Sequence, residues 1–281
     1  MSAIAVLDIT KINTSLLSVG EPKKGKGLSA QLMYDGQRCS LRIPKMSFPG
    51  GLLSRVDESS GNVSHSLIGS LKGCPTDGKA AAEGDDAMAK MYNTLQDTAK
   101  LLKKWAFENS PKLFGKKRSE ESINDSFNER SIMSISCDKV GDEYVPNNKY
   151  APSFRAKIPV YDGRIAMEVV DQNTKPLHLS VESLTSIFPK GVSANLIVNG
   201  AIYIIGQSFG ITWRISMAQV FPPNKLSASS VFDVVEPEAE PEAENQEVDV
   251  QVEESQPQSN PDPAGGAAVP QRKRRSAVNP A

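Results

Sequence analysis

The stretch VSANLIVNGAIYIIGQSFGITWRISMAQVF, residues 192–221, contains two long apolar runs joined by GQSFG. Apolar and polar residues alternate, and β-branched and aromatic residues are frequent, which is typical of half-buried strands. In the second run one face is apolar and the other polar, the two sets being Ile211, Trp213, Ile215 and Met217, and Thr212, Arg214 and Ser216. We therefore expect Trp213 in the core; the alternative is a rim position where its ring stacks on a ligand.

Two hairpins are predicted before this stretch. Asp35-Gly36 separates AQLMY from QRCSLRI, and Asp162-Gly163 lies within SFRAKIPVYDGRIAMEVVD (153–171). Asp-Gly is a strong hairpin signal because both residues tolerate positive φ. The alternation in the second segment places Phe154 and Ile158 on one face, opposite its basic residues.

Residues 84–109 carry one long helical pattern, with apolar residues recurring every three or four positions from Met88 to Trp105. Residues 62–71 are expected to form a strand. A short helix is expected at 180–191, capped by Ser180 and ended by Pro189 and Gly191. The polar segment after Pro111 predicts a loop with a short second helix.

The charges are strongly segregated along the chain. Residues 1–225 hold 28 Lys and Arg against 22 Asp and Glu, residues 226–269 hold 11 acids and no base, and QRKRR follows. The segment after Val235 has almost nothing to bury and cannot offset the entropy of ordering. We predict a mainly β (α+β) domain at 1–230, an OB-like β-barrel with one long inserted helix, and a disordered C-terminal tail at 231–281, acidic with a basic tip.

Enzymatic chemistry finds little support in the residues. GEPKKGKG (20–27) nearly matches a phosphate-binding loop, but Gly27 replaces the expected Ser or Thr and a strand pattern follows. The two histidines, His65 and His178, lie in no recognisable motif. Three cysteines without close spacing make a zinc site unexpected and favour a reduced compartment. We expect no catalytic residues, no metal and no cofactor.

A basic and aromatic surface is more informative. Cations track phosphates and aromatic rings stack on unpaired bases in single-stranded nucleic acid binding, whereas the alternative is a solvated exterior on which Arg and Lys are common. Phe114 is a better candidate for stacking on a base than Trp105, because it lies between lysines in a Gly-containing segment. The candidate nucleic-acid-binding residues are Arg38, Arg42, Lys112, Phe114, Lys116, Lys117, Arg118, Arg155, Lys157, Tyr161, Tyr203 and Arg214.

SFRAKIPVYDGRIAMEVVD followed by GAIYIIGQSFGITWRISMAQV resembles the single-stranded DNA-binding proteins of large nucleocytoplasmic DNA viruses. These are similar to phage replication proteins built on an OB-fold with an acidic C-terminal tail. The resemblance covers residues 150–221 and implies non-sequence-specific binding of single strands and contacts to replication proteins. The tail departs from the phage pattern because its acids end near Asp262 and a basic tip follows.

These observations predict a non-enzymatic single-stranded DNA-binding protein acting in viral DNA replication, recombination or repair. Its partners would be single-stranded DNA and, through the acidic tail, replication proteins, with no membrane. The alternatives are a virion or scaffold barrel that makes protein contacts and an RNA-binding or chaperone protein. No signal peptide is recognised, so we expect the host nucleus or a cytoplasmic replication site, not secretion. The candidate import signal is Arg272, Lys273, Arg274 and Arg275, and such tracts also bind nucleic acid without specificity.

Overall fold

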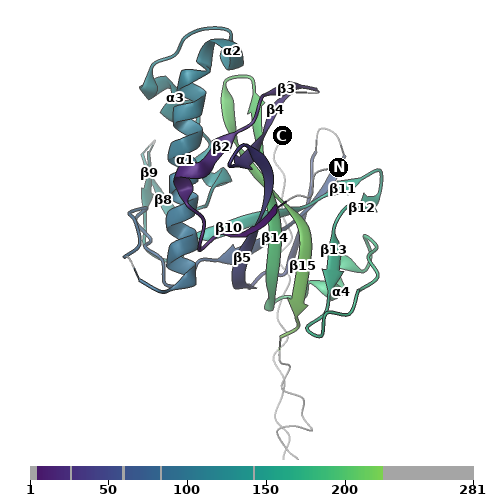
Figure 1. Cartoon of the computed structure of the whole chain (residues 1–281). Coiled ribbons are helices and arrows are strands. Elements are labelled where there is room, and N and C mark those ends of the chain that lie inside the picture. Colours follow the sequence, from purple (N-terminus) through teal and green to yellow (C-terminus); the bar gives the residue numbers. More distant parts are fainter. Residues whose placement is uncertain (1–4, 26, 59–60, 83, 142, 224–281) are drawn as a thin grey trace, which may run out of the picture. The chain divides into compact units, whose positions relative to one another are not determined.

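The computed structural model describes residues 5–25, 27–58, 61–82, 84–141 and 143–223. The predicted tail and import signal lie outside these residues. The described part is mainly strand, with one long helix, α1 (Ala87–Glu108), along one side of the sheet (Figure 1). The other helical elements are η1 (Thr14–Leu16), α2 (Ser110–Phe114), α3 (Glu120–Ser126), η2 (Glu129–Ser131) and α4 (Leu184–Ile187). The strands are β1 (Ala5–Asp8), β2 (Leu17–Val19), β3 (Lys23–Lys24), β4 (Leu28–Tyr34), β5 (Gln37–Phe48), β6 (Leu52–Val56), β7 (Val63–Ser70), β8 (Cys137–Val140), β9 (Glu143–Pro146), β10 (Ser153–Ile158), β11 (Val160–Tyr161), β12 (Arg164–Ile165), β13 (Glu168–Val170), β14 (Val192–Ile205) and β15 (Ser208–Phe221).

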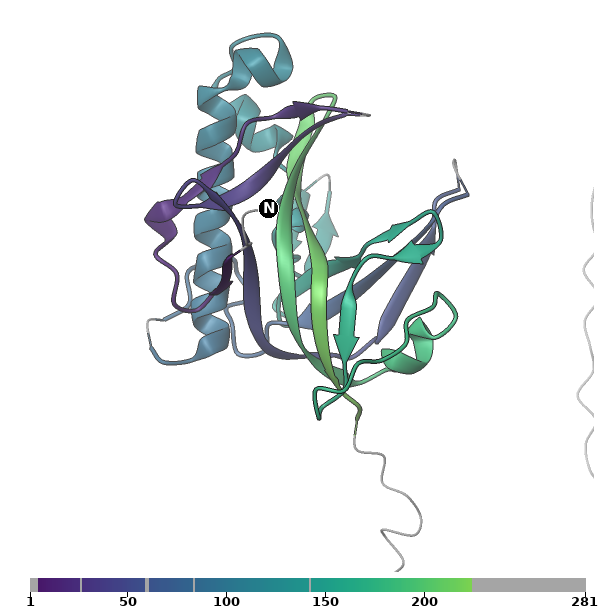
Figure 2. The same ribbon diagram turned by 45° about the vertical axis from the view of Figure 1, so that its right-hand side comes forward.

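The main sheet is organised around the long β14–β15 hairpin, which crosses the middle of the molecule in Figures 1 and 2. Ladders link its strands in the order β1–β5–β4–β14–β15–β10–β7–β6, with β14 also pairing to β5. The pairing of β10 with β15 is parallel, whereas β14–β15 and β10–β7 are antiparallel. The hairpin predicted from residues 192–221 is therefore confirmed, and its second strand pairs with β10, which lies between β15 and β7.

The predicted alternation of buried and exposed residues is confirmed on β10 and β15. Phe154 is buried, while Arg155 and Lys157 are exposed. Trp213 is 1% exposed, and its ring lies 5.8 Å from that of Phe154, centroid to centroid. Because successive strand residues point to opposite faces, this packing directs the basic residues of β10 to the outer face.

Helix α1 confirms the helix predicted at 84–109. The Asp86 side chain caps it by accepting a hydrogen bond from the backbone N–H of Met88 at 3.0 Å. Met91, Leu95 and Leu102 on its inward side are fully buried. This apolar stripe holds the helix against the sheet, where burial of each such side chain contributes roughly 1.5–3 kcal/mol.

Both predicted Asp-Gly turns form, and all four residues have positive φ, from 48° at Asp35 to 75° at Gly163. The first hairpin is nevertheless short: only Met33–Arg38 and Tyr34–Gln37 pair between β4 and β5. Both strands then pair with β14. In the second segment Pro159 separates β10 from β11, so the predicted continuous strand is divided.

The two sides of the curled sheet meet through side chains. A Cβ added to Gly69 on β7 would lie 2.3 Å from the Met46 sulfur and 3.0 Å from a Phe48 ring carbon on β5. Among the described residues, however, no ladder joins β5 to β7. The mainly β prediction is confirmed, whereas the expected barrel is not closed by backbone hydrogen bonds.

The segment after Pro111, predicted as a loop with a short second helix, contains the short helices α2 and α3. Two local predictions need correction. The helix expected at 180–191 is only the four-residue α4, and Ser180 accepts a hydrogen bond of 3.1 Å from the Ser183 backbone N–H in the turn before it. Met217, expected on the buried face, is 44% exposed, since the register shifts opposite Ile197 and Val198 and reverses the alternation.

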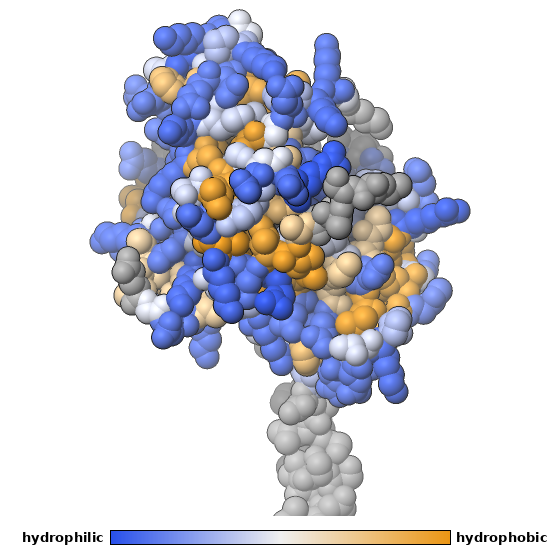
Figure 3. Space-filling view, viewed as in Figure 1, coloured by the Kyte–Doolittle hydropathy of each residue, from blue (hydrophilic) through white to orange (hydrophobic). Residues whose placement is uncertain are grey.

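The surface in Figure 3 is hydrophilic around α2 and α3, and apolar side chains gather nearer the middle of that face. Exposed apolar residues of the described part include Val6 on β1 and Leu16 in η1. Single exposed apolar residues are normal on folded proteins. Within the described residues, no helix is both long and apolar enough to cross a membrane.

Candidate nucleic-acid interface

Three basic residues occupy adjacent positions on the outer face of the sheet. Lys157 on β10 pairs in register with Arg214 on β15, and Arg155 precedes Lys157 by two positions on the same side. All three are exposed, and none is paired with a carboxylate among the residues that the structure describes. We call Arg155, Lys157 and Arg214 the cationic face.

Lys157 and Arg214 have polar, uncharged neighbours on the adjacent strands, whereas Arg155 pairs with Ile68 on β7. Arg214 pairs in register with Asn199 on β14, and Lys157 pairs with Ser66 on β7. The Asn199 side chain accepts a hydrogen bond of 2.5 Å from the Ser40 hydroxyl on β5. One row across the sheet thus carries two cations flanked by hydrogen-bonding groups, a surface suited to an anion with polar substituents.

Tyr161 lies beside the cationic face, as the sequence predicted. Its hydroxyl accepts a hydrogen bond of 3.1 Å from Arg214 Nη1, and its side chain is exposed. The residue is positioned by the short β11–β12 hairpin, whose turn is Asp162-Gly163. An exposed ring next to a guanidinium that has no carboxylate partner among the described residues can stack on a base while the cation contacts a phosphate.

A pocket of about 300 Å³ adjoins the cationic face. It is lined by Ser64, His65, Ser66, Asn128, Arg130, Ser131, Arg155, Lys157, Tyr203, Ile211, Thr212 and Trp213. Three of these residues are cations and none is an acid. Five separate segments of the chain contribute to it, so only the fold brings them together.

Tyr203 is held in a defined position at this pocket. Its hydroxyl accepts a hydrogen bond of 2.9 Å from Asn128 Nδ2. Gly210 pairs with Tyr203 in register, and a Cβ added there would lie 2.7 Å from the tyrosine hydroxyl and 2.6 Å from the Ser131 hydroxyl. The phenol ring therefore lies over Gly210, a close approach that any larger residue would obstruct.

The segment carrying Arg130 is fastened to β15. The Asn128 backbone N–H donates to the Phe209 carbonyl at 2.9 Å, and the Ile211 N–H donates to Ser131 Oγ at 3.1 Å. These bonds place η2, and with it exposed Arg130, at the edge of the pocket. Arg130 and Asn128 lie in a polar segment without periodicity, so no pattern in the sequence predicted their place at the pocket.

Arg118 and Phe114 were predicted to contact nucleic acid, and the structure contradicts the outward position of both. Arg118 is buried, and its guanidinium donates to Ser126 Oγ and to Gln207, and lies 4.0 Å from the centre of the Phe114 ring. Phe114 is partly buried and packs against Phe209. These two side chains therefore make contacts within the protein and do not extend into solvent.

Four further candidates are exposed but lie away from the cationic face. Lys112, Lys116 and Lys117 lie on α2 and the segment after it, outside the lining of the pocket. Arg38 lies next to the turn of the β4–β5 hairpin. The structure does not bring these four residues into the cationic face.

Arg42 lies on the outer face but is already paired. Its Nη2 is 3.0 Å from an Asp8 carboxylate oxygen on β1. Burial alone raises the pKa of Asp8, but hydrogen bonds from Thr10 and Arg42 and the charge of Arg42 hold it below its ordinary value. The carboxylate therefore stays ionised at neutral pH and partly neutralises Arg42.

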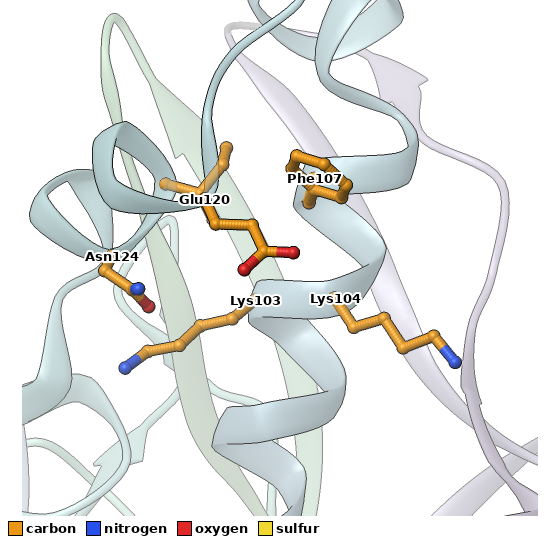
Figure 4. A pocket seen from close by; sticks show the side chains of 6 residues that line it. Lys103, Lys104, Phe107, Glu120 and Asn124 are labelled. Atoms are coloured by element: carbon orange, nitrogen blue, oxygen red, sulfur yellow. The ribbon is translucent and has the colours of Figure 1, made fainter.

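A second pocket, of about 240 Å³, lies between α1 and α3 (Figure 4). Its lysines, Lys103 and Lys104, extend their amino groups in opposite directions, and the Glu120 carboxylate lies between their stems. Lys103 is paired with Glu129. An acid at the centre and diverging cations make this pocket a poor site for phosphate.

No family model and no curated protein matches the chain. Among solved structures, a single-stranded DNA-binding protein from bacteriophage Enc34 in complex with ssDNA is 9% identical, with 74% of this chain and 97% of that chain covered and a TM-score of 0.36. The phage T7 single-stranded DNA-binding protein gp2.5 is 12% identical, with 73% and 100% covered and a TM-score of 0.36. These likenesses are too distant to identify the chain, and neither of these proteins comes from a large nucleocytoplasmic DNA virus.

Proposed function

We propose that the chain binds single-stranded DNA through its cationic face, without sequence specificity and without chemistry. The observation that carries the proposal is the placement of Arg155, Lys157 and Arg214, which are exposed, adjacent and unpaired with carboxylates among the described residues. Cations in a row are suited to follow a phosphate backbone, and this contact needs no particular base.

Aromatic rings favour a single strand over a duplex in this proposal. Tyr161 and Tyr203 flank the cations, from β11 and β14 respectively. Bases are available for stacking on such rings only when they are unpaired, and each stacked base contributes roughly 1–3 kcal/mol. Backbone cations alone would bind duplex as well.

The strand order supports an OB-like binding module. Strands β5, β7, β10, β14 and β15 occur in this order along the chain, with shorter elements between them. In the sheet their hydrogen-bonded order is β7–β10–β15–β14–β5. In an OB-fold the second and third strands present the face that binds oligonucleotides. Counted this way they are β7 and β10, and β10 carries Arg155 and Lys157. We further propose a role in viral DNA replication, recombination or repair, as the sequence resemblance implied.

Fluorescence anisotropy with labelled oligonucleotides tests the proposal. At low salt we expect the full chain to bind a single-stranded DNA oligomer more tightly than the matching duplex, with single-stranded RNA as the third arm. Equal affinities for the single strand and the duplex would contradict the proposed stacking on the aromatic rings. No binding at low salt would overturn the proposal and favour a protein-contact function, and a clear preference for RNA would replace DNA as the ligand.

A further inference from the structure

We propose that the pocket beside the cationic face, lined by Tyr203, Asn128, Arg130, Arg155 and Lys157, is a subsite for one unpaired nucleotide. The inference deepens the proposed function and rests on it. It differs in assigning a discrete position to one base, whereas the cationic face needs only a phosphate backbone. Outside the cationic face, Tyr203 is the pocket residue that the sequence indicated as a candidate. Asn128 and Arg130 were not among those candidates.

The size and charge of the pocket fit one nucleotide. Its volume of about 300 Å³ lies at the lower end of the roughly 300–1,000 Å³ of small-molecule sites. Arg130, Arg155 and Lys157 supply positive charge from η2 and β10, and no acid is among the described residues that line the pocket. A phosphate group is the complement of this charge, because Arg and Lys donate several hydrogen bonds and accept none.

Tyr203 supplies a preorganised platform for the base. Since its hydroxyl accepts from Asn128 Nδ2, the phenolic proton is free to be donated to a ligand oxygen or ring nitrogen. The ring is fixed from below by Gly210 and at its hydroxyl end by Asn128. A ring that is already ordered loses little side-chain entropy when a base stacks on it.

The polar rim of the pocket suits the edges of a base and its sugar. Ser66 and Thr212 contribute hydroxyl groups from β7 and β15. Hydroxyl groups both donate and accept hydrogen bonds, so they can adapt to different bases. In a duplex the Watson–Crick edge of a base is occupied and its faces are stacked on neighbouring bases, so only an unpaired base can enter the pocket and stack on Tyr203.

Photo-crosslinking of the full chain locates the base directly. The probe is a twelve-residue oligo(dT) carrying one 5-iododeoxyuridine, irradiated in complex and mapped by mass spectrometry. We expect the main crosslink on the peptide that contains Tyr203. Crosslinks confined to other residues, for example exposed Tyr150, would overturn the subsite.

Affinity measurements with three variants provide an independent test. Tyr203→Leu is expected to weaken oligo(dT) binding about 5- to 150-fold, the loss of one stacked base, with an unchanged salt dependence because no charge is removed. Gly210→Ala is expected to weaken binding similarly while keeping the phenol ring, because the new Cβ would displace that ring. The φ of Gly210 is not positive, so alanine adds no backbone strain there. Tyr150→Leu is the control and should leave affinity unchanged.

The outcomes separate the subsite from the proposed function. In one outcome, the wild type binds single-stranded DNA with an affinity that Arg155→Gln lowers but that Tyr203→Leu and Gly210→Ala change less than twofold. That result would contradict the subsite and leave the proposed role of the cationic face intact. If the wild type binds no single-stranded DNA at low salt, both are wrong. Should Tyr203→Leu unfold, as judged by circular dichroism, the crosslink on the wild type still decides.

Discussion

At the scale of single residues, strand alternation predicted burial well wherever the register is regular. Trp213 and Arg214 are neighbours in sequence, yet one is buried in the core and the other is exposed beside Tyr161. The alternation failed at Met217, because a shift in register is invisible in a sequence. It also could not show that Arg118 is buried, since that depends on the distant Gln207.

Trp213 tests the face assignment of β15. Trp213→Ala should lower the free energy of unfolding by roughly 3–5 kcal/mol, because it removes a large buried ring. Trp213→Phe should cost less: it keeps ring packing against Phe154, and the indole Nε1 has no hydrogen-bond partner in the described residues. Thermal and urea denaturation give the comparison. Full stability of Trp213→Ala would mean that the faces of β15 are inverted.

At the scale of elements, the sequence predicted the long helix and the long hairpin but not how distant elements join. The stripe on α1 and the alternation of β14 and β15 are local patterns, so a single sequence is sufficient to show them. The pocket requires β7, β10, η2, β14 and β15 to meet, and no local pattern carries that information. The parallel pairing of β10 with β15, which aligns Lys157 with Arg214, was likewise not predictable.

The contact between Arg118 and Gln207 should couple the α2–α3 region to the β14–β15 turn. Gln207 is exposed, whereas Arg118 is buried, with no carboxylate partner among the described residues. Gln207→Ala should destabilise the protein by about 1–3 kcal/mol, because it leaves a buried charged donor short of an acceptor. In an Arg118→Met background the same change should have little effect. Urea denaturation of the four proteins forms a double-mutant cycle, and additive effects would contradict the coupling.

At the scale of the whole chain, the sequence separates a basic body from an acidic segment at 226–269 that lies outside the described residues. Net charge alone, which is -1, conceals this separation. The charge distribution predicts an internal competition, in which the acidic segment screens the cationic face from weakly bound anions. A flexible tether can give such a segment an effective concentration in the millimolar range for short linkers.

Truncation after Phe232 tests this competition. The shortened protein should bind single-stranded DNA more tightly than the full chain at low salt, and the difference should shrink as salt screens the intramolecular attraction. Anisotropy titrations at two salt concentrations measure both effects. Identical affinities at low salt would leave the acidic segment as a spacer without influence on the site.

The salt dependence of oligo(dT) binding tests the central claim most directly. Arg155, Lys157 and Arg214 are replaced together by Gln, and the control is Lys100→Gln, an exposed lysine on α1 that pairs with Asp97. If each of the three cations neutralises one phosphate, the slope of the logarithm of affinity against the logarithm of salt should become shallower by about 2, at roughly 0.7 per phosphate for single strands. The control slope should equal that of the wild type. An unchanged slope in the triple variant would contradict the account, because the phosphates would then be held elsewhere.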